Sequence, residues 1–422
     1  MDRRAFTLGG MALLATRGGT AEAAAATWRC YVGSWTRERG GAGGDGGVHL
    51  IELAGATGAL SLVASVDPAV NAGYLAISPD GVHLCATDER RDLGGTTGAG
   101  GGVVAYRIAA ATGALDRINV TPSMGANPAY ASFDHAGSRL AIANHATYEP
   151  VIGVRDGRLT TTYDDATVTL LPMARDGTIG PATAVATLDP GAGPTPAASA
   201  GLPMTFAASP HAHSANWSPS DRWLLVCDKG ADRLYTFRVA GDRLRRGTRL
   251  SVRPGHSPRH SAFHPRLPLV LIVNEQVPTV DLYHLDERTG GLRHLGTCEL
   301  LDRRSPAGGP VDIPADIQIH PHLPVAYATT RRADVVTVLR LSADPPALER
   351  VQVVRSGGRT PRSCAITPDG RWLLVANQDS GELTPFALDR TDGRLTPAGT
   401  PLRLPRPVCI KVAPRMEPRR AA

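Results

Sequence analysis

Residue pairs with a separation of sixteen positions recur in this sequence, and most of the partners are polar or ionisable. Arginine binds carboxylates and phosphates, while histidine and carboxylate groups move protons. If the members of these pairs converge, they predict an anion-binding site with acid–base chemistry. Six pairs share the spacing: Gly73/Glu89, Ala129/His145, His213/Lys229, Arg259/Glu275, Ala315/Arg331 and Arg362/Gln378.

His213 is the residue that we expect to act as a general base, with His211 as its neighbour. Residues at i and i+2 of a strand point to the same side, so the two histidines could equally fill a structural role. Arg259 and Glu275 could likewise form only a structural ion pair. A metal site built from His211, His213 and Glu275 lacks a defined ligand geometry, so we expect neither a metal nor another cofactor.

The elements that would position these residues repeat along the chain. Each unit is an apolar run, a tight turn and a second apolar run that ends in polar residues. Turns of this kind occur at Pro79-Asp80-Gly81, His135-Ala136-Gly137, Pro219, Pro265, Pro321 and Pro368, and a truncated copy spans residues 408–414. The turns lie 46 to 84 residues apart, which indicates one long insertion at about residues 146–210.

A second set of turns falls between the first ones, where glycine supplies the positive φ of a tight connection. Two hairpins per unit make four strands, and such units predict an all-β fold, a seven-bladed β-propeller. We expect the ring to close by pairing of residues 408–412 with residues 30–35. The second turns are Thr57-Gly58, Thr112-Gly113, Asp176-Gly177, Thr289-Gly290 and Asp392-Gly393.

Composition and charge narrow the classes of protein. The chain has 422 residues, of which 42% are hydrophobic and 20% charged, so it is globular rather than disordered. Its net charge of +6 comes from 45 basic and 39 acidic residues. Only Lys229 and Lys411 are lysines, and the arginines are spread without basic blocks. We therefore expect no nucleic-acid partner.

The first 25 residues differ from the rest. Paired Arg3 and Arg4 precede a short apolar segment and small residues, which is typical of a twin-arginine signal peptide. No segment is long enough for a membrane span. We expect one propeller domain over residues 26–422, exported to the periplasm or secreted. Cysteines stand in apolar runs and are expected to be free.

The residues around the inner strands resemble those of the seven-bladed lactonase family, which includes propeller-type 6-phosphogluconolactonases and carboxy-cis,cis-muconate cyclase. The motifs that carry this resemblance are His211-Ala212-His213, Pro258-Arg259-His260, Asn274-Glu275, Thr329-Thr330-Arg331 and Thr360-Pro361-Arg362. The resemblance implies a cleft on the propeller face and a functional set of His213, Arg259, Arg331 and Glu275. The sequence Thr329-Thr330-Arg331 departs from the family pattern, and the adjacent Arg331 and Arg332 leave open which arginine faces the channel.

The resulting hypothesis is a metal-independent lactone hydrolase, acting on a sugar-derived or carboxylated lactone as a monomer. His213 would activate water, Arg259 or Arg331 would stabilise the oxyanion, and Glu275 would orient Arg259 or move a proton. A lactone-forming cycloisomerase and a non-catalytic binding propeller remain as alternatives. The further residues expected to line the channel or bind substrate are His211, Arg362, Lys229, Glu89, His145 and Gln378.

Overall fold

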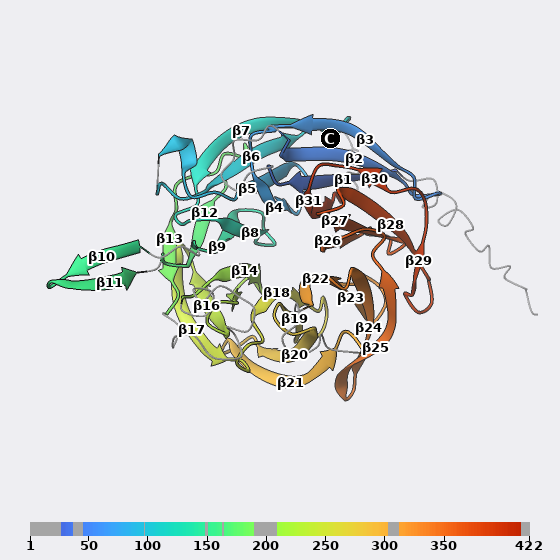
Figure 1. Ribbon diagram of the computed structural model, residues 1–422. Coiled ribbons are helices and arrows are strands. Elements are labelled where there is room, and N and C mark those ends of the chain that lie inside the picture. The colour runs from blue at the N-terminus through green and yellow to red at the C-terminus, as the bar shows by residue number, and fades with distance from the viewer. Residues whose placement is uncertain are drawn as a thin grey trace, which may run out of the picture.

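Seven four-stranded antiparallel sheets surround a central axis, and the chain visits them in order around the ring (Figure 1). The computed structural model describes residues 27–36, 45–96, 98–147, 151–162, 164–189, 209–302 and 312–414. The predicted signal peptide lies outside these residues. The predicted seven-bladed propeller is confirmed.

From its innermost strand outward, blade 1 consists of β31 (Pro407–Val412), β1 (Thr27–Ser34), β2 (Gly47–Ala54) and β3 (Leu60–Val66), and the strands of the other blades are given in the same direction. Blade 2 is β4 (Ala72–Ile77), β5 (His83–Asp88), β6 (Gly102–Ile108) and β7 (Leu115–Pro122), with the 3₁₀ turn η1 (Leu93–Gly95) between β5 and β6. Blade 3 is β8 (Pro128–Phe133), β9 (Arg139–Asn144), β12 (Thr167–Pro172) and β13 (Ala184–Thr187).

The remaining blades follow the same plan. Blade 4 is β14 (Ala212–Trp217), β15 (Trp223–Asp228), β16 (Arg233–Ala240) and β17 (Arg243–Ser251). Blade 5 is β18 (Pro258–Phe263), β19 (Leu269–Asn274), β20 (Thr279–Asp286) and β21 (Gly291–Glu299). Blade 6 is β22 (Ile313–Ile319), β23 (Val325–Arg331), β24 (Val335–Ala343) and β25 (Pro346–Arg355). Blade 7 is β26 (Pro361–Ile366), β27 (Trp372–Asn377), β28 (Glu382–Leu388) and β29 (Leu395–Pro397), and β30 (Leu402–Arg403) also pairs with β28.

Blade 1 is assembled from both ends of the described chain. β31 pairs antiparallel with β1, so that Cys30 faces Val412 and Val32 faces Ile410. This pairing matches the expected closure and covers the strand edge that an open array of blades would leave exposed. The glycines of the five predicted outer turns, Gly58, Gly113, Gly177, Gly290 and Gly393, all have φ between 71° and 90°.

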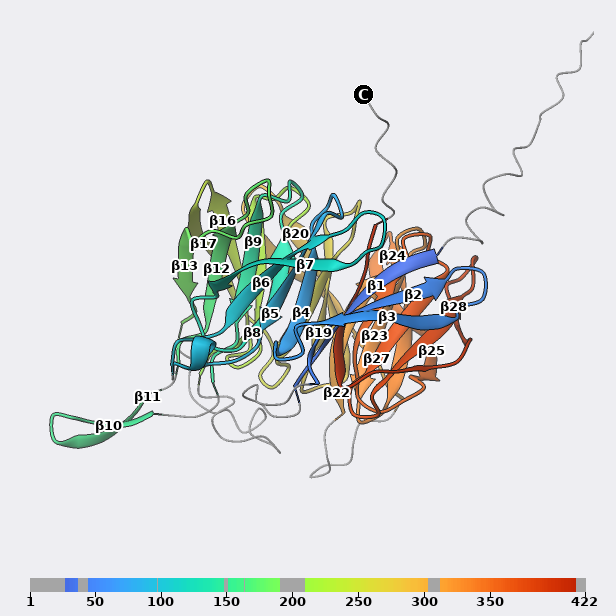
Figure 2. The same cartoon turned by 90° about the horizontal axis from the view of Figure 1, so that it is seen from above.

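The range 146–210, predicted as one insertion, divides into two kinds of structure. β12 and β13 lie inside it and complete blade 3, while β10 (Val151–Arg155) and β11 (Arg158–Thr162) form a separate two-stranded hairpin. This hairpin projects from the side of the ring, on the same face as η1 (Figure 2). The blade itself is therefore regular, and the described extra segment is the hairpin between its second and third strands.

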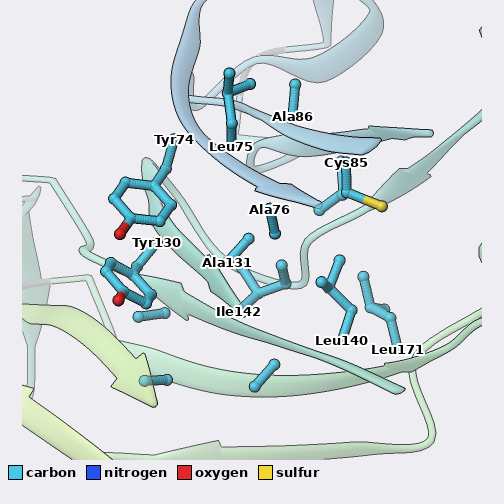
Figure 3. Close-up of a cluster of buried hydrophobic side chains, with 14 of the residues drawn as sticks. Tyr74, Leu75, Ala76, Cys85, Ala86, Tyr130, Ala131, Leu140, Ile142 and Leu171 are labelled. Atoms are coloured by element: carbon cyan, nitrogen blue, oxygen red, sulfur yellow. The ribbon is translucent and has the colours of Figure 1, made fainter. Parts of the chain in front are cut away.

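Apolar side chains fill the space between neighbouring blades. Leu75, Leu140 and Ile142 are buried in one such cluster between blades 2 and 3 (Figure 3). Tyr74 and Tyr130 stack at the axial end of this cluster, with ring centroids 4.0 Å apart. All six cysteines are buried and free, as expected.

Candidate active site

A β-bulge at the start of every innermost strand positions the candidate residues. In blade 4, Ala212 pairs with Asp228 and Ser214 with Cys227, which leaves His213 as the extra residue. In blade 5, Pro258 and His260 are paired, and Arg259 is the extra residue. Bulges bend a strand and redirect a side chain. The first members of the sixteen-residue pairs therefore lie in bulges and are not directly opposite the second members.

The second members of the pairs follow the ends of the second strands. A backbone hydrogen bond fixes this position in several blades: Glu89 N–H donates to Asn71 O, His145 N–H to Asn127 O, Lys229 N–H to His211 O, Glu275 N–H to Ser257 O and Gln378 N–H to Thr360 O. The acceptor is always two residues before the bulge residue. The sixteen-residue spacing in the sequence thus reflects a backbone hydrogen bond that recurs at the same end of each of these blades.

Glu275 holds three cations of the site together. Its carboxylate accepts bonds from Lys229 Nζ at 3.1 and 3.2 Å. Arg259 Nε lies 2.9 Å from Oε2, and Arg331 Nη2 lies 3.4 Å from Oε1. These opposite charges hold the pKa of Glu275 well below its usual range despite burial. The expected pairing of Glu275 with Arg259 is present, and it belongs to a larger cluster.

Burial lowers the pKa of two cations in that cluster. Lys229 and Arg259 are 5% and 1% exposed. Desolvation lowers the pKa of Lys229 to about 7, with further lowering by Arg259 and Arg331 against the opposing effect of Glu275. Desolvation also lowers the pKa of Arg259 to about 9. At neutral pH the guanidinium stays charged, whereas the lysine amine is close to its titration midpoint.

His213 is an uncharged histidine at neutral pH. Burial lowers its pKa well below 6.5, and nearby Arg259 and Lys229 lower it further. Its Nδ1 is buried without a hydrogen-bond partner. The ring lies 5.1 Å from that of His260 and 5.5 Å from that of His145. A neutral imidazole in this setting can accept a proton.

The candidate residues surround one cavity of about 300 Å³ at the axis. Seven of its lining residues are basic and three are acidic, an excess of four positive charges when Lys229 is protonated. Such a cavity favours an anionic ligand. The charged lining residues are Arg90, Arg91, Lys229, Arg259, Arg331, Arg362, Arg406, Glu89, Asp92 and Glu275.

The structure brings most of the predicted residues to this cavity. Two of them do not line it: His211 lies behind His145, with its ring stacked at 4.5 Å and its Nδ1 2.8 Å from His145 O, and Gln378 donates to Asp379. Arg331 lines the cavity and Arg332 does not. Those that line it are His213, Arg259, Glu275, Arg331, Arg362, Lys229, Glu89 and His145.

Several lining residues were not predicted. Trp35 and Arg406 belong to the closing blade, where Trp35 N–H donates to Arg406 O at 3.2 Å. Trp35 directly follows β1 and so occupies the second-member position of that blade, which an alignment of the composite blade with the other six would have shown. The Arg362 guanidinium stacks over the Trp35 ring, with its central carbon 4.1 Å from the ring centroid. The others are Thr36, Asn71, Arg90, Arg91, Asp92, Asn127 and Thr147.

A second layer of side chains lies beneath the cavity. Arg259 Nη1 is 3.1 Å from His260 Nε2 and also donates to Ala315 O. His260 Nδ1 lies 3.0 Å from Asp316 Oδ1, and Asp316 also accepts from Ser363. His260 therefore contacts the site residues from below.

No three His, Cys, Asp or Glu side chains among the described residues gather closely enough to hold a metal ion. Within the same ranges, no helix has the length and apolar character needed to cross a bilayer.

The chain is similar to known proteins in both sequence and fold. A family model described as Lactonase, 7-bladed beta-propeller, matches residues 29–412. A 6-phosphogluconolactonase from Formosa agariphila is 26% identical over 372 residues, covering 86% of this chain and 94% of that protein. One from Bacillus subtilis is 24% identical over 385 residues, covering 90% and 97%. The solved periplasmic gluconolactonase of Pseudomonas aeruginosa has the same fold, with 24% identity, a TM-score of 0.76 and coverage of 92% and 99%.

Proposed function

Because this chain belongs to the seven-bladed β-propeller lactonase family, we propose that it hydrolyses a lactone in the axial cavity. The observation that carries the proposal is the placement of His213 in the same cavity as Arg259 and Arg331. Lactone hydrolysis needs a proton acceptor beside cations that stabilise an oxyanion. The relatives from Formosa agariphila and Bacillus subtilis are named 6-phosphogluconolactonases, and such enzymes are lactone hydrolases.

In the proposed reaction, His213 accepts a proton from water as the water oxygen bonds to the lactone carbonyl carbon. Negative charge then develops on the carbonyl oxygen, and Arg259 or Arg331 stabilises it. The bond between that carbon and the ring oxygen breaks, and the ring oxygen takes up a proton. The product is an open-chain hydroxy acid, whose carboxyl group ionises and releases one proton.

We propose an anionic sugar-derived lactone as the substrate. The excess of four positive charges in the cavity supports this choice. Arg362 lines the cavity, and its guanidinium carbon lies 4.1 Å from the centroid of the Trp35 ring, which orients the group. Arginine matches carboxylate and phosphate geometry through two parallel hydrogen bonds.

We also propose that the protein acts after export to the periplasm or the cell exterior. Support comes from the paired Arg3 and Arg4 before an apolar segment, and from the solved neighbour that is described as periplasmic. A carboxylated sugar lactone fits that location better than a phosphorylated cytoplasmic metabolite does.

The test is a panel of neutral, carboxylated and phosphorylated sugar lactones, with acid release followed at constant pH. We expect hydrolysis of an anionic lactone and a loss of about 10²–10⁴ in kcat for His213→Ala, the usual contribution of a general base. The control is His322→Ala, an exposed histidine outside the cavity lining. Hydrolysis of none of the lactones would refute the proposal, and a His213→Ala variant at full activity would refute the role of His213.

A further inference from the structure

The two lysines of this chain stand out against its arginine usage. Of 45 basic residues, only Lys229 and Lys411 are not arginine. Lys229 lines the candidate active cavity, whereas Lys411 donates from Nζ to Tyr74 OH at 3.0 Å on the second layer. The cavity therefore contains six arginines and a single lysine.

The difference between the two residue types matters for proton transfer. A guanidinium stays charged at neutral pH and there serves as a fixed cation. A buried ammonium shifts its pKa readily and can deliver a proton. Among the basic side chains that line the cavity, Lys229 alone can do so near neutral pH.

The contacts of Lys229 keep its ammonium group in place. Nζ lies 3.1 and 3.2 Å from the two oxygens of Glu275, and that carboxylate is anchored in turn by Arg259 and Arg331. Lys229 also belongs to the same blade as His213, because His213 is the bulge residue of β14 and Lys229 directly follows β15. A proton donor and a proton acceptor therefore border one cavity from a single blade.

We propose that Lys229 is the general acid of the lactone hydrolysis proposed above, and that Glu275 positions it. Its ammonium gives a proton to the ring oxygen while the bond between that oxygen and the carbonyl carbon breaks. The amine left behind regains a proton from His213, which received one from the attacking water. The cycle consumes one lactone and one water and returns both side chains to their starting states.

The pH dependence follows from the groups that face Lys229. Burial brings its pKa to about 7, so the protonated fraction falls as the pH rises through that value, and kcat should fall with it. His213 is neutral over this whole range because its pKa lies well below 6.5. Two groups with pKa values set apart in this way are typical of an acid–base pair. The charged and titratable neighbours of Lys229 are Glu275, Arg259, Arg331, His145, His211 and His213.

The experiment compares an active lactone with its thiolactone, in which sulfur replaces the ring oxygen. A thiolate is a good leaving group without protonation, whereas an alkoxide oxygen must receive a proton as the bond to the carbonyl carbon breaks. For Lys229→Arg, which keeps a positive charge, we expect kcat for the lactone to fall about 10²–10⁴-fold, the range of general acid–base catalysis. The loss for the thiolactone should be below about tenfold, and the fall of kcat above pH 7 should disappear.

His322→Ala, at an exposed histidine outside the cavity lining, is the control, and it should keep the wild-type rate and pH profile. Equal losses on lactone and thiolactone for Lys229→Arg, or a wild-type kcat that rises through pH 7, would overturn the role of Lys229 and leave lactone hydrolysis intact. If the wild type hydrolyses no lactone, the proposed function fails and the general acid fails with it. Circular dichroism of Lys229→Arg and of Lys229→Met separates misfolding from a lost proton donor.

Discussion

At the scale of single residues, the sequence identified the charged groups of the cavity better than their partners. The sixteen-residue spacing predicted Arg259 and Glu275 as neighbours, and the structure adds Lys229 and Arg331 to the same carboxylate. Such a cluster depends on contacts between three blades. The sixteen-residue spacing relates two residues of the same blade, so it cannot predict contacts between residues of different blades.

Asp228 gives a residue-scale test of stability. Its Oδ1 accepts from the N–H groups of His211, Gly230 and Ala231, and burial raises its pKa to about 7. The unfolded chain titrates this carboxyl near 3.8, so ionisation destabilises the fold increasingly from about pH 4 to pH 7 and by a constant amount above. Equivalent strand ends carry Asn144, Asn274 and Asn377.

We therefore expect Asp228→Asn to favour the folded state more at high pH. The unfolding free energy of the variant minus that of the wild type should be about 2–3 kcal/mol larger at pH 8 than at pH 5, at 1.36 kcal/mol per pKa unit. Urea unfolding at both pH values measures it. The same difference from wild type at pH 5 and pH 8 would contradict a raised pKa for Asp228.

At the scale of elements, turns were more predictable than bulges. The paired glycines fixed the outer hairpins because a positive φ restricts the residue type, as at Gly290, where a Cβ would lie 2.6 Å from the Trp223 ring. The bulges at His213 and Arg259 leave no such mark, since any side chain fits an extra strand residue. The sequence alone therefore predicted that these residues lie at one end of their blades, but it did not predict that the first members lie in bulges.

The β10–β11 hairpin gives the element-scale prediction. Its strands pair only with each other among the described residues, and Val154 and Leu159 are 68% and 79% exposed. Replacing residues 148–163 by a short Gly-Ser linker should leave the thermal unfolding midpoint within about 2 °C and kcat within twofold, because no blade loses a strand. Differential scanning calorimetry and the lactone assay measure both. A large fall in midpoint would show that the hairpin supports blade 3.

At the scale of the whole molecule, ring closure joins the two ends of the described chain. Recognition of the repeat predicted this pairing because seven units need a composite blade. The lining residues contributed by that blade were harder to find, since Trp35 and Arg406 are far apart in the sequence. A search confined to contiguous repeats omits them.

Closure can be locked by a single substitution. Cys30 stands opposite Val412 across the β1–β31 pair, and facing strand positions lie within disulfide range. Val412→Cys should form a disulfide with Cys30 under oxidising conditions and stabilise the protein by about 2–4 kcal/mol. Thermal unfolding with and without reductant measures this gain, and Cys30→Ser in the same background is the control. A gain that survives reduction would exclude the cross-link as its cause.

The bond from Trp35 N–H to Arg406 O also sets when the cavity comes into existence during synthesis. At roughly 5–20 residues per second, a ribosome takes tens of seconds to proceed from the first of these residues to the second. Until then the axial cavity lacks one side, however well the middle blades have formed. Premature termination should therefore yield inactive chains rather than partly active ones, and enzymatic activity reports that translation reached the final strand.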